Sequence, residues 1–327
     1  MIIVRCPLRI SLGGGGTDLA SYYKKREGFL VAGTINKYIY IAIHKTFDSQ
    51  IIAKYSSVEK VNTFSEISHP IIKEVLKKYL PEINSIEITS FADIPSGTGL
   101  GSSSAFTNAL IKGIHSFKMD QIDNQVLAEE SCDIEINKLK EPIGKQDQYI
   151  TALGGIRAFT FRKDESVNHS LVLDSENDYS LFSSNLVLVF TGKTRRASTL
   201  LKDQKDKSEN NNEQMLKNLD DTKKLGKKSL HAIRSKNFDE FGSIMHEHWL
   251  NKKRRSKGMT DDHIDEIYKF GLSHGANGGK VIGAGGGGFL LFQTSERNKL
   301  VNQLSRRGYR IVDFNFVPSG CEIINLS

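Results

Sequence analysis

Apolar and polar residues alternate over several stretches of the chain, and other stretches carry apolar residues every three or four positions. Alternation is typical of half-buried strands, and the wider spacing is typical of helices with one buried face. In the first half, the pattern predicts helices at 70–79, 105–117 and near 124–139, and strands at 2–12, 29–35, 37–46, 51–55, 86–91 and 155–162. In the second half, it predicts helices within 195–256 and at 260–274 and 295–306, and strands at 186–190, 280–283, 289–293, 309–316 and 320–324.

The polar segment from Arg162 to Ser180 interrupts this pattern. A chain of 327 residues is long enough for two domains. We therefore predict a domain boundary near the end of the segment, which gives domains at 1–180 and 181–327.

A turn rich in glycine and serine joins the strand at 86–91 to the helix after it. Its glycines allow close approach to a ligand and positive φ angles, and the amides at a helix start favour an anion. An ordinary loop with a serine cap needs only one glycine and one serine, so the composition favours a phosphate site. The candidate residues are Ser96, Gly97, Thr98, Gly99, Leu100, Gly101, Ser102, Ser103 and Ser104.

Four consecutive glycines, at 13–16, end the first predicted strand and precede Thr17 and Asp18. Packing alone hardly explains them, because each glycine raises the entropy cost of ordering the chain. Close approach of the backbone to a ligand is the better explanation, with Arg9 just upstream on the strand. Asp18 could equally cap a helix that begins at Leu19.

The helix near 124–139 carries one unusual acid. On a helical projection, Glu135 shares its side with small and apolar residues, whereas the other acids of the segment fall on the far side. A carboxylate on such a face is costly unless it is paired or binds a cation. Glu135 is therefore the candidate functional acid of this helix.

Net charge is +7, and the surplus is local: residues 193–257 contain 18 Lys/Arg against 9 Asp/Glu. Aromatic interleaving and recognised nucleic-acid modules are missing, so we expect no nucleic-acid partner. A surface that attracts phosphorylated small molecules and a solvated helix face both explain the charge. Three scattered cysteines indicate free thiols in the cytoplasm, and no apolar run reaches the ~18 residues of a membrane span.

Two further motifs are less informative. Residues 283–288 match the dinucleotide pattern G-x-G-x-x-G, but a strand-like segment follows instead of the required helix. His246 and His248 lack the spacing of a helical zinc site, and we interpret them as surface histidines.

The three glycine-rich motifs in this order resemble the GHMP kinases (galacto-, homoserine, mevalonate and phosphomevalonate kinases). The motifs lie at 7–18, 95–105 and 280–292 and together span nearly the whole chain. Within the family, the Gly-Gly-Gly-Gly-Thr-Asp run and the segment from Gly144 to Tyr149 are most similar to the D-glycero-D-manno-heptose 7-phosphate 1-kinases. L-fucokinase and other sugar 1-kinases share much of the pattern.

The resemblance implies an α+β, two-lobed fold: a domain like ribosomal protein S5 domain 2, then a ferredoxin-like domain, with the active site between them. The serine turn would bind ATP phosphates, and Ser103 and Glu135 would hold Mg²⁺. Asp147 would be the catalytic carboxylate, and Arg9 an active-site arginine. Without the resemblance, Asp147 could equally be a helix cap or a surface acid.

The implied reaction transfers phosphate from ATP to the anomeric hydroxyl of a sugar phosphate, for heptose and surface polysaccharide synthesis. Galactokinases carry Glu-His at the positions of Gly15 and Gly16, so a bulkier sugar fits better. Lys193, Arg195 and Arg196 are candidates for binding the sugar's phosphate, with the segment from Lys252 to Arg255 a weaker one. The substrate-binding set is Gly15, Gly16, Thr17, Asp18, Gly144, Lys193, Arg195, Arg196, Gly285, Gly286 and Gly287. A homodimer is possible, and a sensor that binds sugar and ATP without turnover is the alternative to an enzyme.

Overall fold

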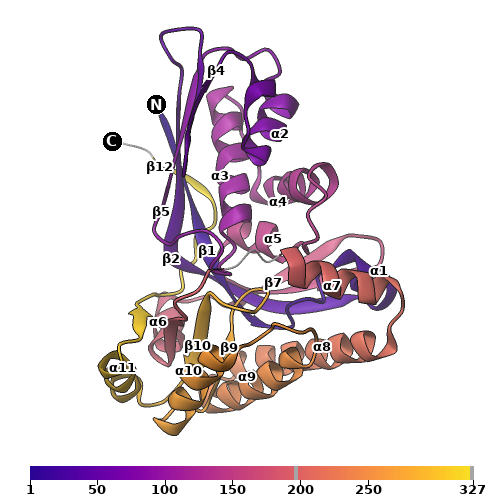
Figure 1. The fold of residues 1–327 in the computed structure, drawn as a ribbon, viewed down its shortest axis with the longest axis vertical. Coiled ribbons are helices and arrows are strands. Elements are labelled where there is room, and N and C mark those ends of the chain that lie inside the picture. Colours follow the sequence, from indigo (N-terminus) through magenta and orange to yellow (C-terminus); the bar gives the residue numbers. More distant parts are fainter. Residues whose placement is uncertain (195–197, 325–327) are drawn as a thin grey trace.

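A single long strand, β2 (Gly28–His44), is the central strand of the first of two β-sheets (Figure 1). β1 (Ile2–Gly13) pairs with β2 along almost its whole length. One half of the other edge of β2 pairs with β6 (Ile156–Phe161), and the other half pairs with β5 (Ile86–Ala92). The computed structural model describes residues 1–194 and 198–324.

The rest of this sheet extends from these four strands. The added strands are β3 (Ile51–Lys54) and β4 (Val58–Val61) beyond β5, β7 (Val167–Leu173) beyond β6, and β12 (Glu322–Ile324) beside β1. The alternation predicts two strands, 29–35 and 37–46, where the structure has β2 alone. The reason is a bulge: Pro7 pairs with Tyr38 but Leu8 pairs with Ile35, which leaves two residues of β2 without partners in β1.

Helices cover one face of the upper part of this sheet (Figure 1). They are α2 (Pro70–Tyr79), α3 (Ser102–Phe117), α4 (Asn124–Cys132), a π-helical segment (Asp133–Lys138) and α5 (Gln146–Leu153), while α1 (Ala20–Arg26) follows β1. A single 3₁₀ turn, Phe64–Glu66, precedes α2. Ala105, Ala109 and Ile114 of α3, which belong to the apolar pattern that predicts this helix, are fully buried.

The second sheet is antiparallel, in the order β11 (Arg310–Val312), β8 (Leu186–Phe190), β10 (Phe289–Gln293) and β9 (Gly278–Val281). Its helices, in chain order, are α7 (Ser198–Glu209), α8 (Glu213–Arg234), α9 (Phe238–Lys253) and α10 (Asp262–Ser273) between β8 and β9, and α11 (Arg297–Arg306) between β10 and β11. This strand order is that of the ferredoxin-like fold, so the predicted α+β architecture is confirmed.

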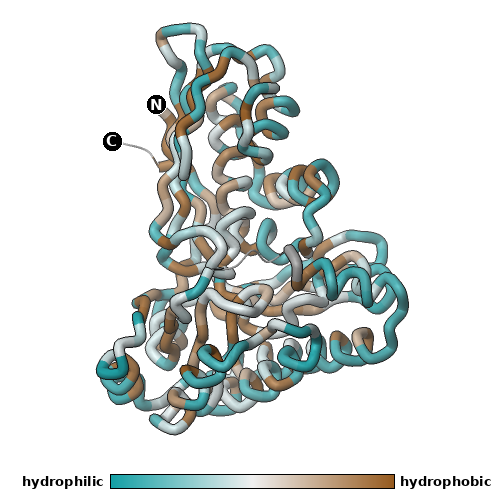
Figure 2. Tube along the Cα trace, viewed as in Figure 1, coloured by the Kyte–Doolittle hydropathy of each residue, from teal (hydrophilic) through white to brown (hydrophobic). Residues whose placement is uncertain are grey.

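Both faces of the second sheet are buried, which explains why its strands consist mostly of apolar residues (Figure 2). Val187 and Val189 of β8 pack with the helices of the second lobe, whereas Leu186 and Leu188 join the core that continues under the first sheet. A strand buried on both faces reads as a continuous apolar run. One core therefore holds the two lobes together.

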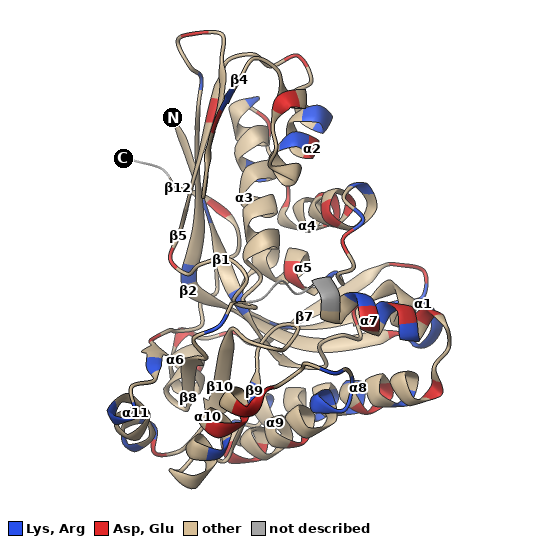
Figure 3. Ribbon diagram, in the orientation of Figure 1, with Lys and Arg blue, Asp and Glu red and all other residues tan. Residues whose placement is uncertain are grey.

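The polar segment at 162–180, where the sequence pattern predicted no helix or strand, contains β7 and the start of α6 (Glu176–Ser184). The predicted boundary at residue 180 falls inside α6 and stays a prediction. Basic and acidic side chains are mixed along α7 and α8 (Figure 3), so part of the charge in this region lies on solvated helix surfaces. No helix in the described ranges is both long and apolar enough to cross a membrane.

Candidate active site

A cavity of about 510 Å³ lies where the three glycine-rich segments meet. This volume is in the range of small-molecule sites. The predicted site residues among its lining residues are Arg9, Gly15, Gly16, Asp18, Gly97, Gly99, Gly101, Ser102, Ser103, Ser104, Gly144, Asp147, Gly285 and Gly287.

The serine turn forms the start of α3, as predicted. Gly101 precedes the helix with φ +78°, and Ser102 is its first residue. A Cβ on Gly101 would lie 3.0 Å from Cγ of Arg9, so a side chain there is opposed by both conformation and space. The amides of the first helical turn and the serine hydroxyls consequently border the cavity, an arrangement suited to an anion.

The third motif supports the serine turn. It connects β9 to β10, which confirms the predicted strand after it in place of the helix that the dinucleotide motif requires. A Cβ on Gly99 would lie 2.7 Å from the carbonyl oxygen of Ile282, and one on Gly288 would lie 2.1 Å from that of Thr98. The two turns therefore pack backbone against backbone, which only glycine permits.

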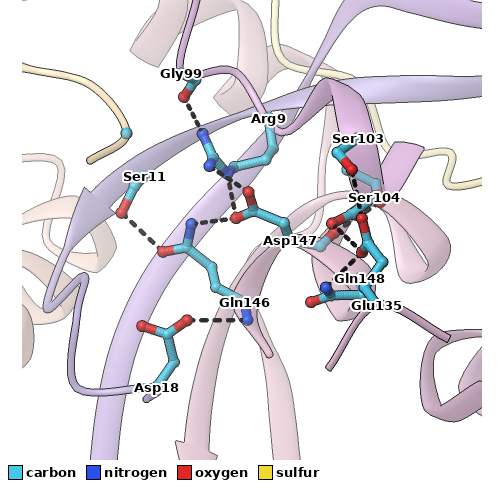
Figure 4. Close-up of polar contacts among 12 residues, drawn as sticks. Arg9, Ser11, Asp18, Gly99, Ser103, Ser104, Glu135, Gln146, Asp147 and Gln148 are labelled. Carbon is cyan, nitrogen blue, oxygen red and sulfur yellow. Dashed lines mark hydrogen bonds and ion pairs between the residues drawn. The ribbon is translucent and has the colours of Figure 1, made fainter. Parts of the chain in front are cut away.

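Arg9 and Asp147 form a bidentate ion pair beside this turn (Figure 4). The Arg9 Nε and Nη2 atoms donate to the two carboxylate oxygens over 2.7 and 2.6 Å, and Nη1 donates to the Gly99 carbonyl over 2.5 Å. Arg9 is 4% exposed, whereas the Asp147 side chain is 27% exposed. Asp147 thus lies in the first turn of α5, held in a fixed orientation with one side open to the cavity.

Glu135 is buried, as its helical position predicts, with 1% of its surface exposed. Its carboxylate accepts hydrogen bonds from Ser103 Oγ (2.5 Å), Ser104 Oγ (2.7 Å) and Gln148 Nε2 (2.6 Å). Burial raises the pKa of Glu135, and these three donors oppose the rise. The π-helical geometry begins two residues before Glu135, and π-helical turns inside helices are frequent at functional sites.

The oxygens of Ser103 and Glu135 fit a magnesium ion. Mg²⁺ prefers hard oxygen ligands and is usually held by one or two carboxylates together with substrate phosphates. Within residues 1–194 and 198–324, no group of three or more His, Cys, Asp or Glu residues could hold a metal alone. The donor set therefore suits an ion that arrives with a phosphate ligand.

Asp18 does not cap α1, because Leu19 occupies that position and Asp18 points elsewhere. Its carboxylate accepts from the backbone N–H groups of Gly16 (3.0 Å) and Gln146 (3.1 Å). Burial raises the pKa of Asp18, and the Asp147 carboxylate adds to the rise. A Cβ on Gly144 would lie 2.0 Å from Asp18 Oδ2, which explains the glycine at 144.

Several cavity residues were not predicted. Gln146 accepts from Ser11 Oγ (2.9 Å) and donates to Asp147 Oδ1 (2.8 Å), so it links β1 to the acid. Lys280 of β9, 2% exposed, also lines the cavity. A lone lysine in an apolar strand is the signal that would have found it, by the argument applied to Glu135.

The prediction of surface histidines is wrong. His248 is 3% exposed, lines the cavity, and accepts a hydrogen bond from the Gly14 N–H at its Nε2 (3.3 Å). His246 is partly buried and contacts the Tyr268 hydroxyl over 2.7 Å. The residues around these two histidines come from distant segments, so the local sequence spacing gives no sign that the histidines are buried.

Lys193 is not brought to the cavity. It is exposed and forms an ion pair with Asp261. Arg195 and Arg196 lie outside the described residues. Thr17 is buried, and its hydroxyl bonds to the carbonyls of Gly14 and Phe29 instead of facing the cavity. The remaining predicted residues that do not line the cavity are Ser96, Thr98, Leu100, Glu135 and Gly286, although Ser103 and Ser104, which do line it, donate to the Glu135 carboxylate.

Comparison with known proteins agrees with this geometry. The model of the GHMP kinases N terminal domain matches residues 68–155, and that of the GHMP kinases C terminal matches residues 229–310. D-glycero-alpha-D-manno-heptose 7-phosphate kinase of Campylobacter jejuni is 30% identical, over 98% of this chain and 97% of that protein. The bifunctional fucokinase/GDP-fucose pyrophosphorylase of Arabidopsis thaliana is 23% identical, over 90% of this chain and 30% of that protein.

Solved structures show the same fold. A D-glycero-D-manno-heptose 1-phosphate kinase of Bacteroides thetaiotaomicron superposes with a TM-score of 0.80 at 23% identity, over the full length of both chains. Galactokinase of Lactococcus lactis bound to galactose superposes with a TM-score of 0.76 at 16% identity, over 98% of this chain and 94% of that one. Because both family models match and the Campylobacter relative aligns with nearly the whole chain, this protein belongs to the GHMP kinase family.

Proposed function

We propose that this chain transfers the γ-phosphoryl group of ATP to the anomeric hydroxyl of D-glycero-D-manno-heptose 7-phosphate, giving the 1,7-bisphosphate. Such a product would supply nucleotide-activated heptose for surface polysaccharide. One observation carries the proposal: the Arg9–Asp147 ion pair lines the same cavity as the serine turn and the first turn of α3. Full-length similarity to a heptose 7-phosphate kinase supports the choice of sugar.

The reaction would proceed in line. The anomeric oxygen bonds to the γ-phosphorus, the bond to the oxygen bridging the β-phosphate breaks, and ADP leaves with that electron pair. Charge develops mostly on the transferred phosphoryl oxygens, so fixed donors contribute more than proton removal does. The amides of the serine turn and the guanidinium of Arg9 would supply these donors.

Asp147 would orient the anomeric hydroxyl and accept its proton late in the reaction. Its carboxylate is fixed by Arg9 and Gln146, and its exposed side faces the cavity. Asp18, hydrogen-bonded to the backbone near Gly144, would accept hydrogen bonds from sugar hydroxyls. Ser103 and Glu135 would hold a magnesium ion, which would supply charge neutralisation for the phosphates of ATP.

A substrate panel tests this proposal. Heptose 7-phosphate, mannose 6-phosphate, unphosphorylated heptose, fucose and galactose are each incubated with MgATP, and phosphorus NMR identifies the new bond. We expect a second phosphate on C1 of heptose 7-phosphate. Fucose phosphorylated in its place would favour a fucokinase, as the Arabidopsis relative suggests, and no ADP release with any sugar would favour a sensor.

A further inference from the structure

The cavity has a basic wall that the proposed chemistry does not use. It consists of Lys252 near the end of α9, Arg255 just after α9, and Lys280 on β9. Their exposed fractions are 6%, 6% and 2%. We refer to these three residues as the cationic wall.

No carboxylate forms an ion pair with the cationic wall within the described part of the chain. Lys252 Nζ donates to the carbonyls of Val281 (3.1 Å) and Gly283 (2.5 Å). Among the residues that the structure describes, Arg255 donates only to neutral oxygens: those of Gly15, Gln204, Asn218 and Thr222. The Lys280 ammonium has no hydrogen-bond partner among residues 1–194 and 198–324, although the side chain lines the cavity.

Three buried cations close to one another are unfavourable without an anion, because each loses hydration and repels the others. Burial and the neighbouring cations lower the pKa of Lys252 and of Lys280. A bound group with two negative charges would remove this repulsion and would satisfy the free ammonium donors of Lys280.

The first glycine motif makes room for this wall. A Cβ on Gly16 would lie 2.6 Å from Arg255 Nη1, and Arg255 Nη1 itself donates to the Gly15 carbonyl over 3.1 Å. Asp18 is close enough to influence the pKa of Arg255. The wall therefore reaches the glycine run and Asp18 at its Arg255 end, while Lys280 is close enough to Arg9 for the two cations to repel each other.

We propose that Lys252, Arg255 and Lys280 bind the phosphate group that the sugar already carries. This proposal rests on the proposed function, because the anomeric hydroxyl must lie at Asp147 while the phosphate lies at the wall. It gives this role to Lys252 and Arg255, which belong to the weaker of the two candidate segments, and adds Lys280, whereas Lys193 of the first candidate segment is paired with Asp261 outside the cavity. Selection for a phosphorylated sugar then follows from the charge of the wall.

The test compares Lys280→Met with a matched control, Lys224→Met. Lys224 is a lysine of α8 whose side chain is 73% exposed and pairs with Asp221. The rate constant kcat/KM is measured for heptose 7-phosphate and for unphosphorylated heptose, and ATP affinity is measured by calorimetry. Lys280→Met should lower kcat/KM for the phosphosugar about 10- to 100-fold, because this is the usual contribution of a hydrogen bond to a charged group. Changes in kcat/KM for heptose and in ATP affinity should stay below about threefold.

Equal losses for phosphorylated and unphosphorylated heptose would overturn the proposal, because Lys280 would then act on the transferred phosphate or on the fold. A Lys193→Met variant that loses phosphosugar selectivity while Lys280→Met keeps it would overturn it too. Lys280→Gln, which keeps a polar group, provides a second variant if the methionine protein folds poorly. A wild-type protein that phosphorylates only unphosphorylated sugars would refute the proposed function itself, a result visible before any variant is made.

Discussion

Replacing Asp147 with asparagine tests the assigned proton acceptor. Asparagine has nearly the same size but accepts no proton, and a positioned base contributes about 10²- to 10⁴-fold to a rate. The Asp147 carboxylate receives three hydrogen bonds, at 2.7, 2.6 and 2.8 Å, two from Arg9 and one from Gln146. We therefore expect kcat to fall about 10²- to 10⁴-fold, which corresponds to ~2.7–5.4 kcal/mol of activation free energy.

The same substitution leaves Arg9 without its counter-charge. Removing one partner of a fully buried ion pair costs about 3–5 kcal/mol of the free energy of unfolding. The Arg9 side chain is 5% exposed, whereas that of Asp147 is 27% exposed, so water screens part of the interaction. We expect a loss of about 1–3 kcal/mol, part of which the double variant Arg9→Met/Asp147→Asn should recover.

Activity is followed by coupled ADP release with the sugar that the NMR panel identifies, and stability by urea unfolding. Asp313→Asn serves as the control, because Asp313 is 87% exposed in its ion pair with Arg297 and should contribute no more than about 1 kcal/mol. ATP affinity of Asp147→Asn should stay close to that of the wild type. The assigned role is refuted if kcat falls less than about tenfold while the protein stays folded.

Three further changes follow from the same geometry. Gly144→Ala places a Cβ 2.0 Å from Asp18 Oδ2, so kcat/KM for the sugar should fall at least about tenfold with ATP binding retained; calorimetry showing both unchanged would contradict the assignment of Asp18. Glu135→Gln removes a buried charge that the magnesium ion would need, so the Mg²⁺ concentration for half-maximal rate should rise at least about tenfold, and an unchanged magnesium titration would exclude Glu135 as a ligand. Burial and the nearby arginines lower the pKa of Lys280 to about 7, so between pH 7 and 9 the unfolded chain binds more protons and the free energy of unfolding should rise with pH. In urea unfolding of the substrate-free protein, Lys280 alone should contribute a slope of up to ~1.4 kcal/mol per pH unit, which Lys280→Met removes. Equal slopes for the variant and the wild type would show that Lys280 is charged throughout.

The sequence-based predictions that the structure confirms depend on residues close to one another in the sequence. The serine turn was visible because positive φ and close backbone approach demand glycine at 97, 99 and 101. Glu135 was visible because helical periodicity alone puts it on a buried face. Both arguments need only neighbours within a few turns of chain.

What the sequence did not show depends on contacts between distant segments. Lys280 and His248 meet from β9 and α9, so their shared cavity exists only after the second lobe has folded. The bulge in β2 arises from its register with β1 and interrupts the alternation of apolar and polar residues. The sequence pattern therefore predicted two strands where the structure has one. In the same way β7 was missed, because its three consecutive residues Asn168, His169 and Ser170 are polar and exposed, and pairing with β6 makes this segment a strand.

The pairing of β12 with β1 has a consequence for biosynthesis. Arg5 and Glu322, joined across these strands by a hydrogen bond, are 317 residues apart in sequence. While the ribosome translates everything between them, the outer edge of the strand that bears Arg9 stays open. Open edges invite strand pairing between molecules. Newly made chains are consequently most prone to aggregate in the interval before Glu322 emerges, and a holdase chaperone acting in that interval should raise the yield of active kinase.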